Sequence, residues 1–129
     1  MKDFILFIWQ LPQNILGLIV ILFTQAKYVK AGFWISSKYA FGVSLGKYII
    51  FGQVVSETEL NHEQGHQKQS IYLGWFYLLI IGIPSFIGNV WDRLFHKNWA
   101  MNKRYSWYYN LPWEKWADEL GDVRRNLCV

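Results

Sequence analysis

The sequence predicts an α+β membrane protein, mainly helical, with a small antiparallel β-sheet, and three observations lead to this fold class. Hydrophobic residues make up 53% and aromatic residues 19% of the chain, which is more apolar surface than a small soluble core needs. Two uncharged apolar stretches, 4–23 and 71–90, are each about as long as a membrane helix. Between them, runs of aromatic and β-branched residues alternate with glycines, as in strands. With 129 residues, the chain 1–129 is expected to form one membrane-embedded domain.

The first apolar stretch, 4–23, is expected to form a membrane helix that is broken near Pro12. Proline removes one helical hydrogen bond, and polar residues surround it. The side chains of Gln10, Gln13 and Asn14 are expected to face protein rather than lipid. A cleaved signal peptide is the alternative interpretation, although the apolar region exceeds the usual length of about 7–15 residues and lacks a convincing cleavage site.

Residues 28–55 are expected to form the small antiparallel sheet, because four glycines separate its short apolar runs. The clearest hairpin joins 39–44 to 47–51, with its turn near Leu45 and Gly46. A helix over 56–70 should follow at once. Ser56 and Glu59 fit the capping-box pattern, in which each side chain satisfies a backbone amide at the start of a helix.

An HExxH sequence, His62-Glu63-Gln64-Gly65-His66, lies on this expected helix. Residues four apart share one helical face, so both imidazoles can bind one Zn²⁺ ion while Glu63 lies beside a coordinated water as general base. A polar helix start with solvated imidazoles is the alternative interpretation. The pattern predicts a catalytic zinc site with His62 and His66 as metal ligands and Glu63 as catalytic residue.

The candidate third ligand lies on a last helix, expected over 113–126. A catalytic zinc needs a third protein ligand, and Glu114 could complete a His₂Glu site. Asp118 lies four residues later on the same helical face, where it could accept the N–H of a ligating histidine and fix its orientation. A solvated acidic edge is the alternative, because Glu119 and Asp122 lie in the same segment.

HExxH on one helix and ExxxD on a later helix together resemble the gluzincin zinc metallopeptidases. The membrane context resembles the HtpX and CAAX-prenyl-protease branch of that family, and the preceding sheet and helix order are similar to a minimal gluzincin core. The resemblance rests mainly on residues 62–66 and 114–118. It implies three zinc ligands, a general base and a carboxylate that orients the first ligand, and the matching residues are His62, His66, Glu114, Glu63 and Asp118.

The apolar stretch 71–91 must bring the chain back to the metal. If it crossed the bilayer once, Glu114 would start on the wrong side, and lipid-exposed extended backbone could not lead it back. A re-entrant helical hairpin broken near Pro84 solves this, with its turn at Gly82-Ile83-Pro84 and two half-length helices that enter and leave the membrane.

The charge pattern predicts the partners and the orientation. The net charge of +4, interspersed with apolar residues, favours the lipid bilayer as partner and no nucleic acid, with RNA binding as a minor alternative. Of the 13 Lys and Arg residues only Lys2 precedes the first apolar stretch, so the other 12 lie on the side of the active site if the hairpin is re-entrant. This predicts a bacterial inner-membrane protein with its active site on the cytoplasmic side. No GxxxG motif lies in either long apolar stretch, so nothing there supports an oligomer. The single Cys128 excludes an intrachain disulfide.

These features predict a zinc endopeptidase that cleaves membrane-associated or membrane-adjacent polypeptides. The sheet could align an extended substrate as an added strand. Candidate donors to the oxyanion are Tyr108, Tyr109, His96 and Arg104, each of which also suits an interfacial anchor. The alternative is a noncatalytic membrane protein with a structural or regulatory zinc site, or with a sheet that binds a peptide.

Overall fold

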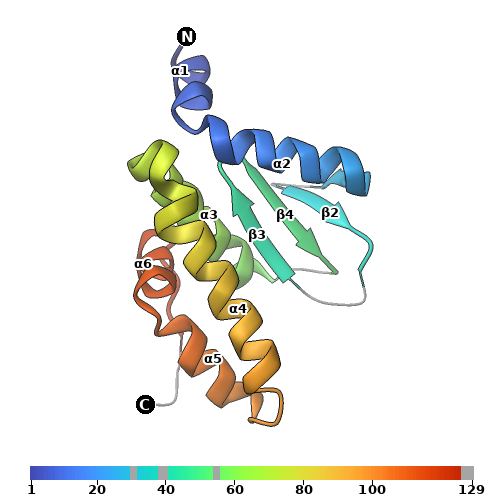
Figure 1. Cartoon of the computed structure of the whole chain (residues 1–129), viewed down its shortest axis with the longest axis vertical. Coiled ribbons are helices and arrows are strands. Elements are labelled where there is room, and N and C mark those ends of the chain that lie inside the picture. The colour runs from blue at the N-terminus through green and yellow to red at the C-terminus, as the bar shows by residue number, and fades with distance from the viewer. Residues whose placement is uncertain (30–31, 38–40, 54–55, 126–129) are drawn as a thin grey trace.

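The structure is a computed structural model, and it describes residues 1–29, 32–37, 41–53 and 56–125. Helices make up most of it, and four short strands form one small sheet that precedes the longest helix (Figure 1). This confirms the predicted combination of a mainly helical chain with a small sheet.

The N-terminal apolar stretch forms two helices, α1 (Lys2–Trp9) and α2 (Leu11–Thr24), bent by 87°. Pro12 lies in the first turn of α2, where its missing N–H leaves no helical hydrogen bond unmade. The predicted break near Pro12 is therefore confirmed. The polar side chains at the bend are buried against protein, as expected, and these are Gln10, Gln13 and Asn14.

The sheet is mixed, so the prediction of an antiparallel sheet is wrong in one of its three pairings. Its order is β1-β2-β4-β3, and the strands are β1 (Lys27–Val29), β2 (Gly32–Ile35), β3 (Phe41–Leu45) and β4 (Tyr48–Gly52). β2 pairs in parallel with β4, whereas the other two pairs are antiparallel. After β2 the chain forms β3 at the edge of the sheet, and β4 then lies between β2 and β3. Apolar runs mark strands but do not specify their neighbours, which is why the sequence pattern missed this order.

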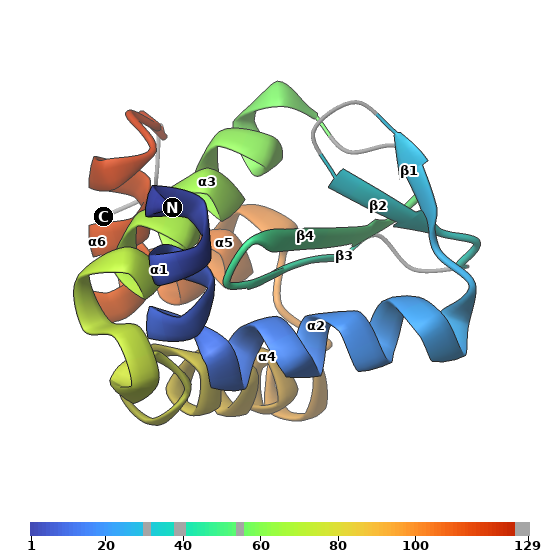
Figure 2. The ribbon, with the colours of Figure 1, turned by 90° about the horizontal axis from the view of Figure 1, so that it is seen from above.

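The predicted β3–β4 hairpin is confirmed where the structure describes it. Leu45 lies opposite Tyr48, so Gly46 and Lys47 form a two-residue turn, and Gly46 has a φ of +65°, which favours glycine. Asn14 of α2 accepts a hydrogen bond from the Lys47 backbone N–H at 2.7 Å. The helix α2 thus fixes this turn, and Figure 2 shows it running along the sheet. Residues 39–40 of the predicted hairpin and 54–55 of the predicted sheet region lie outside the described residues.

The helix that carries HExxH is α3 (Glu57–Leu73), and it extends three residues beyond the predicted end. Ser56 caps it, because its side chain accepts a hydrogen bond from the Glu59 backbone N–H at 3.3 Å, as the capping box predicts. The helix packs beside the edge strand β3 (Figure 1). This edge of the sheet therefore lies next to the predicted site.

The re-entrant hairpin predicted over 71–91, with its turn at Gly82-Ile83-Pro84, is wrong, because the chain reverses at Gly74 and is continuously helical over Leu78–Phe95. The short 3₁₀ turn η1 (Gly74–Phe76) ends α3, and η2 (Leu78–Gly82) continues into α4 (Ile83–Phe95), which runs back down the molecule (Figure 1). Gly74 has a φ of +55°, and a Cβ there would lie 2.3 Å from the Trp9 ring, so only glycine suits this reversal. Pro84 does not break the helix, because it lies in the first turn of α4 and a π-helical turn precedes it.

One helical segment of the described chain, Leu78–Phe95, is long and apolar enough to span a membrane, and α1 with α2 reaches that length only as a bent pair. Few residues of Leu78–Phe95 are buried. Large apolar side chains are exposed along α1, α2 and α4, while polar and charged side chains outnumber hydrophobic ones among the buried residues that the structure describes. This distribution is the reverse of that in a soluble domain.

The last two helices are α5 (Met101–Tyr109) and α6 (Pro112–Leu120). The helix predicted over 113–126 therefore ends at Leu120, because the backbone turns at Gly121 and Asp122, which has a φ of +55°. Residue 126 of that prediction lies outside the described residues.

Glycines let α6 cross α3 closely. A Cβ at Gly65 would lie 1.9 Å from the Ala117 carbonyl oxygen, and one at Gly121 would lie 2.0 Å from the Asn61 carbonyl oxygen. Both contacts join backbone to backbone, so neither neighbour can turn aside as a flexible side chain could. This close crossing positions the third predicted ligand.

Candidate metal centre

The two histidines of the HExxH sequence lie on the same face of α3, as their spacing predicts. His62 and His66 are both buried, and their rings meet edge to face with centroids 4.7 Å apart. Gly65, between them on the helix, faces α6. The local geometry follows from the helix alone.

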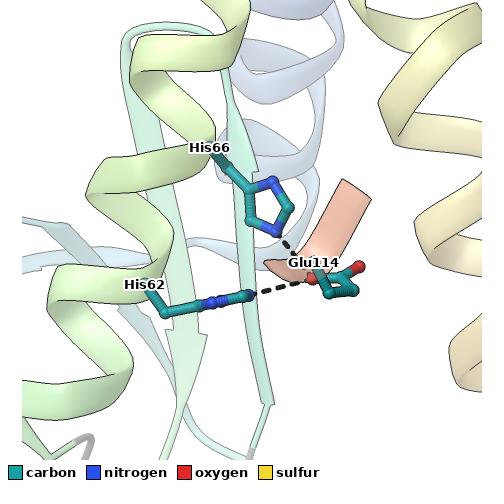
Figure 3. Close-up of side chains that lie close together, drawn as sticks. All are labelled: His62, His66 and Glu114. Atoms are coloured by element: carbon teal, nitrogen blue, oxygen red, sulfur yellow. Dashed lines mark hydrogen bonds and ion pairs between the residues drawn. The ribbon is translucent and has the colours of Figure 1, made fainter. Parts of the chain in front are cut away.

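Glu114 of α6 reaches both imidazoles (Figure 3). Its Oε2 atom lies 3.0 Å from His62 Nε2 and 3.0 Å from His66 Nε2, and the Glu114 side chain is fully buried. The three ligand atoms lie within 4.8 Å of one another. The buried group His62, His66 and Glu114 could therefore hold a metal ion, and the structure brings together the three residues predicted as ligands.

The second nitrogen of each imidazole has a partner of its own. Asp118 Oδ1 lies 2.6 Å from His62 Nδ1, as predicted, and Gln69 Oε1 lies 2.6 Å from His66 Nδ1. An oxygen acceptor at Nδ1 keeps the imidazole hydrogen on that atom, so the lone pair of Nε2 points toward the place where the three ligand atoms meet, as in known metal sites. Gln69 is anchored in turn by a hydrogen bond from its Nε2 to the Trp113 carbonyl oxygen at 2.9 Å.

The sequence reasoning missed Gln69, although a signal was present. Gln69 follows His66 by three residues, so the two share a helical face, and an amide oxygen can accept the histidine N–H. A search for acceptors three or four residues from each predicted histidine ligand would have found it.

The other oxygen of Glu114 is held by hydroxyl groups. Tyr108 donates to Glu114 Oε1 at 3.0 Å, and the Ser85 hydroxyl donates to the same oxygen. Ser85 lies on α4 and Tyr108 on α5, so two further helices fix this carboxylate. With Oε1 engaged, Glu114 offers one oxygen to the common point. No sequence signal marks Ser85, which is a single hydroxyl in an apolar run.

Glu63 is buried, and its Oε2 atom has no hydrogen-bond partner among the described residues. Its side chain lies against β3, where a Cβ at Gly42 would be 2.9 Å from Glu63 Oε1. A buried carboxylate oxygen without a partner is costly unless a ligand or water contacts it. It therefore fits a site that takes up a ligand beside the metal-binding group.

A cavity of about 840 Å³ opens onto His62 and Glu63. It lies between β3, the start of α3, and the α4 and α5 helices, and its remaining lining residues are Phe41, Gly42, Ser56, Glu59, Asn89, Asp92, Arg93, Met101, Arg104, Tyr105, Tyr108 and Tyr109. The size suits several residues of a bound chain or a small ligand of ordinary dimensions.

The pKa shifts indicate that the site stabilises positive charge. Burial alone would lower the pKa of His62, but hydrogen bonds to Asp118 and Glu114 outweigh burial and raise this pKa to about 10. Burial would raise the pKa of Glu114, yet hydrogen bonds from both imidazoles hold it well below its usual range. Burial raises the pKa of Glu63 despite the nearby histidines. The carboxylates therefore favour a cation at the histidines, either protons or a metal ion.

The four candidate oxyanion donors lie in different places. Tyr108 contacts Glu114 and lines the cavity, and Arg104 lines the cavity but pairs with Asp92 at 2.8 Å. Tyr109 also lines it and donates to Glu59. His96 stacks on Trp99, with ring centroids 3.6 Å apart. Of the four, Tyr108 is the one whose hydroxyl contacts a predicted metal ligand.

No family model, no curated protein and no solved structure matches the chain. The functional interpretation therefore depends on the metal-binding group, the cavity and the surface of the fold.

Proposed function

We propose that this chain is a zinc-dependent integral-membrane endopeptidase that hydrolyses peptide bonds in membrane-associated or membrane-adjacent polypeptides. The observation that carries the proposal is the meeting of two imidazoles and a carboxylate at one buried point, with Glu63, whose Oε2 atom has no partner among the described residues, beside them. The order of these residues along the chain resembles that of gluzincin metallopeptidases, of the HtpX and CAAX-prenyl-protease type.

Zinc is the metal proposed for the site. Two histidine nitrogens and one glutamate oxygen are a common donor set for catalytic zinc, which leaves a position open for water or substrate. The ligands would be His62, His66 and Glu114, with Asp118 and Gln69 setting the orientation of the two rings. A zinc ion held there would lower the pKa of a bound water and polarise a peptide carbonyl.

Glu63 is the proposed general base. Its unpaired Oε2 atom is free to take a proton from the attacking water and to pass it to the leaving amine. Burial raises the pKa of this carboxyl, which favours its acceptance of a proton. Tyr108, which lines the cavity, is the proposed donor to the oxyanion, and its hydroxyl would leave Glu114 Oε1, which Ser85 also holds, to make that bond.

The edge strand β3 is the proposed binding site for an extended substrate. It is the last strand of the sheet on the side of α3, and its residues Phe41 and Gly42 line the cavity. A polypeptide added to this edge would gain backbone hydrogen bonds and would pass Glu63, which lies against Gly42. Backbone pairing places little demand on sequence, so we expect broad cleavage preferences.

The proposed location is the bacterial inner membrane, with the active site on the cytoplasmic side. The exposed apolar side chains of α1, α2 and α4 and the polar interior support a lipid environment. The basic residues that follow the first apolar stretch support this orientation provided that α4 enters the bilayer without crossing it, because they then all lie on one side.

The proposed activity is tested with Glu63→Gln, compared with Glu57→Gln on the exposed start of the same helix. In detergent micelles with an unstructured, quenched-fluorescence polypeptide, Glu63→Gln should bind zinc as the wild type does but lose turnover. Glu57→Gln should keep both, and His62→Ala should lose zinc. Unchanged turnover in Glu63→Gln would refute the proposed base. Zinc binding without any turnover in the wild type would favour a noncatalytic metal site.

A further inference from the structure

A single arginine near the end of the described chain contacts the carboxylate that orients His62. Arg125 Nε donates to Asp118 Oδ2 at 2.9 Å, and Arg125 Nη2 donates to Asp118 Oδ1 at 3.3 Å. This two-point contact matches the fork of a guanidinium to both oxygens of one carboxylate, and it fixes the rotation of that carboxylate. Asp118 Oδ1 is also the atom that lies 2.6 Å from His62 Nδ1.

The backbone after α6 is shaped to deliver Arg125 to this place. Gly121 packs against the Asn61 backbone, and Asp122 takes a φ of +55°. The Val123 N–H then bonds back to the Asp118 carbonyl oxygen at 2.8 Å. The chain reverses beside α6, and Arg125 returns to the side on which Asp118 lies.

Further contacts hold the guanidinium from the other side. It lies over the Tyr109 ring, with Cζ 3.5 Å from the ring centroid, and Nη1 lies 3.6 Å from Glu59 Oε1. The Tyr109 ring itself meets the His62 ring edge to face at 5.2 Å. Arg125 thus joins the start of α3, the end of α5 and the end of α6 around one imidazole.

We infer that Arg125 is a positioning residue of the metal site, which acts on His62 through Asp118. Without the guanidinium, the buried Asp118 carboxylate would lose two donors and could rotate about its side-chain bonds, and the His62 ring would lose its fixed orientation. His66 has no such arrangement, because the neutral Gln69 holds it. The inference rests on the metal site of the proposed function but not on catalysis.

The test measures the zinc affinity of the full-length protein in detergent, by competition with a chromophoric chelator. Removal of a direct partner of a metal ligand commonly weakens metal binding about 10–100-fold. Arg125 acts one contact further out, so Arg125→Gln should raise the Kd for zinc by about 10-fold, the lower end of that range. Arg124→Gln is the matched control, because it removes the same charge from the neighbouring exposed residue, and it should leave the Kd unchanged. Arg125→Lys keeps the charge but loses the fork, and its Kd should lie between those of the wild type and Arg125→Gln.

A double-mutant comparison separates positioning from general support of the fold. In an Asp118→Asn background, which already lacks the carboxylate, Arg125→Gln should cause little further loss of zinc affinity. Equal losses in both backgrounds, or a wild-type Kd in Arg125→Gln, would overturn the inference while leaving the proposed function intact. If Arg125→Gln does not fold, the Kd for zinc is measured for Arg125→Lys with and without Asp118→Asn, and the two losses are compared in the same way. A wild-type protein that binds neither zinc nor cobalt would overturn both proposals.

Discussion

Gly65→Ala is expected to weaken metal binding strongly by adding one methyl group. The Cβ that it adds would lie 1.9 Å from the Ala117 carbonyl oxygen, and contacts below 3.0 Å are essentially never observed, so α3 and α6 must separate by at least about 1.1 Å. The histidines lie on α3 and Glu114 lies on α6, so the separation acts directly on the distances between the ligands. Metal sites tolerate deviations of only about 0.2 Å in ligand distances.

Two measurements check this prediction. The Kd for zinc, measured by chelator competition, should rise by about 100-fold or more, because the separation of about 1.1 Å far exceeds the deviation of about 0.2 Å expected in metal–ligand distances, and loss of an outer partner alone commonly costs about 10–100-fold. The free energy of unfolding should fall by about 1–3 kcal/mol, the usual cost of an added methyl group in a packed interface. Gly82→Ala is the control, since the atom nearest to its Cβ is the flexible Leu78 side chain at 3.1 Å. A Gly65→Ala protein that binds zinc as tightly as the wild type would refute the reasoning.

Three further predictions concern other parts of the molecule. Gln69→Leu removes the acceptor at His66 Nδ1 and should weaken zinc binding about 10–100-fold, measured by chelator competition. An unchanged Kd for zinc would mean that the His66 ring needs no such partner. Because the pKa of His62 is raised to about 10, zinc must displace a proton at neutral pH, so zinc affinity should rise with pH up to about 10. Calorimetry in two buffers of different ionisation enthalpy should detect the released proton, and finding none would contradict the pKa shift. Ile87→Lys places a charge on the exposed face of α4 and should make the free energy of membrane insertion less favourable by about 2.5–3.5 kcal/mol. Carbonate extraction should then release the Ile87→Lys protein but not the control Glu119→Lys, which changes an exposed residue of α6. Full retention of Ile87→Lys in the membrane would argue against a lipid-facing α4.

The parts of the site that the sequence predicted are those set by helical spacing. His62 and His66 are four residues apart, as are Glu114 and Asp118, and a helix places each pair on one face whatever the rest of the chain does. The contact between these two helices was predicted because a catalytic zinc needs a third protein ligand in addition to the two histidines. The contacts of Glu114 and Asp118 with the histidines agree with that expectation.

The parts that the sequence did not predict depend on contacts between distant elements. Ser85 supports Glu114 from α4, and Arg125 supports Asp118 after a chain reversal, and neither position has a local pattern. The position of the helical turn was misjudged because Pro84 was taken as a stop, whereas Gly74, which the Trp9 ring covers, reverses the chain. The parallel pairing of β2 with β4 is likewise a matter of strand order and not of strand composition.

The buried amides of α2 have a consequence for the order in which the protein assembles. Asn14 bonds to Lys47, 33 residues later, and Gln13 bonds to Ser70 and to the Gly74 carbonyl oxygen, 57 and 61 residues later. During synthesis these amides emerge long before their partners exist, so α2 cannot reach its final hydrogen bonding until residue 74 has been made. Until then, the nascent segment needs water, a neighbouring protein or a translocation channel to solvate it.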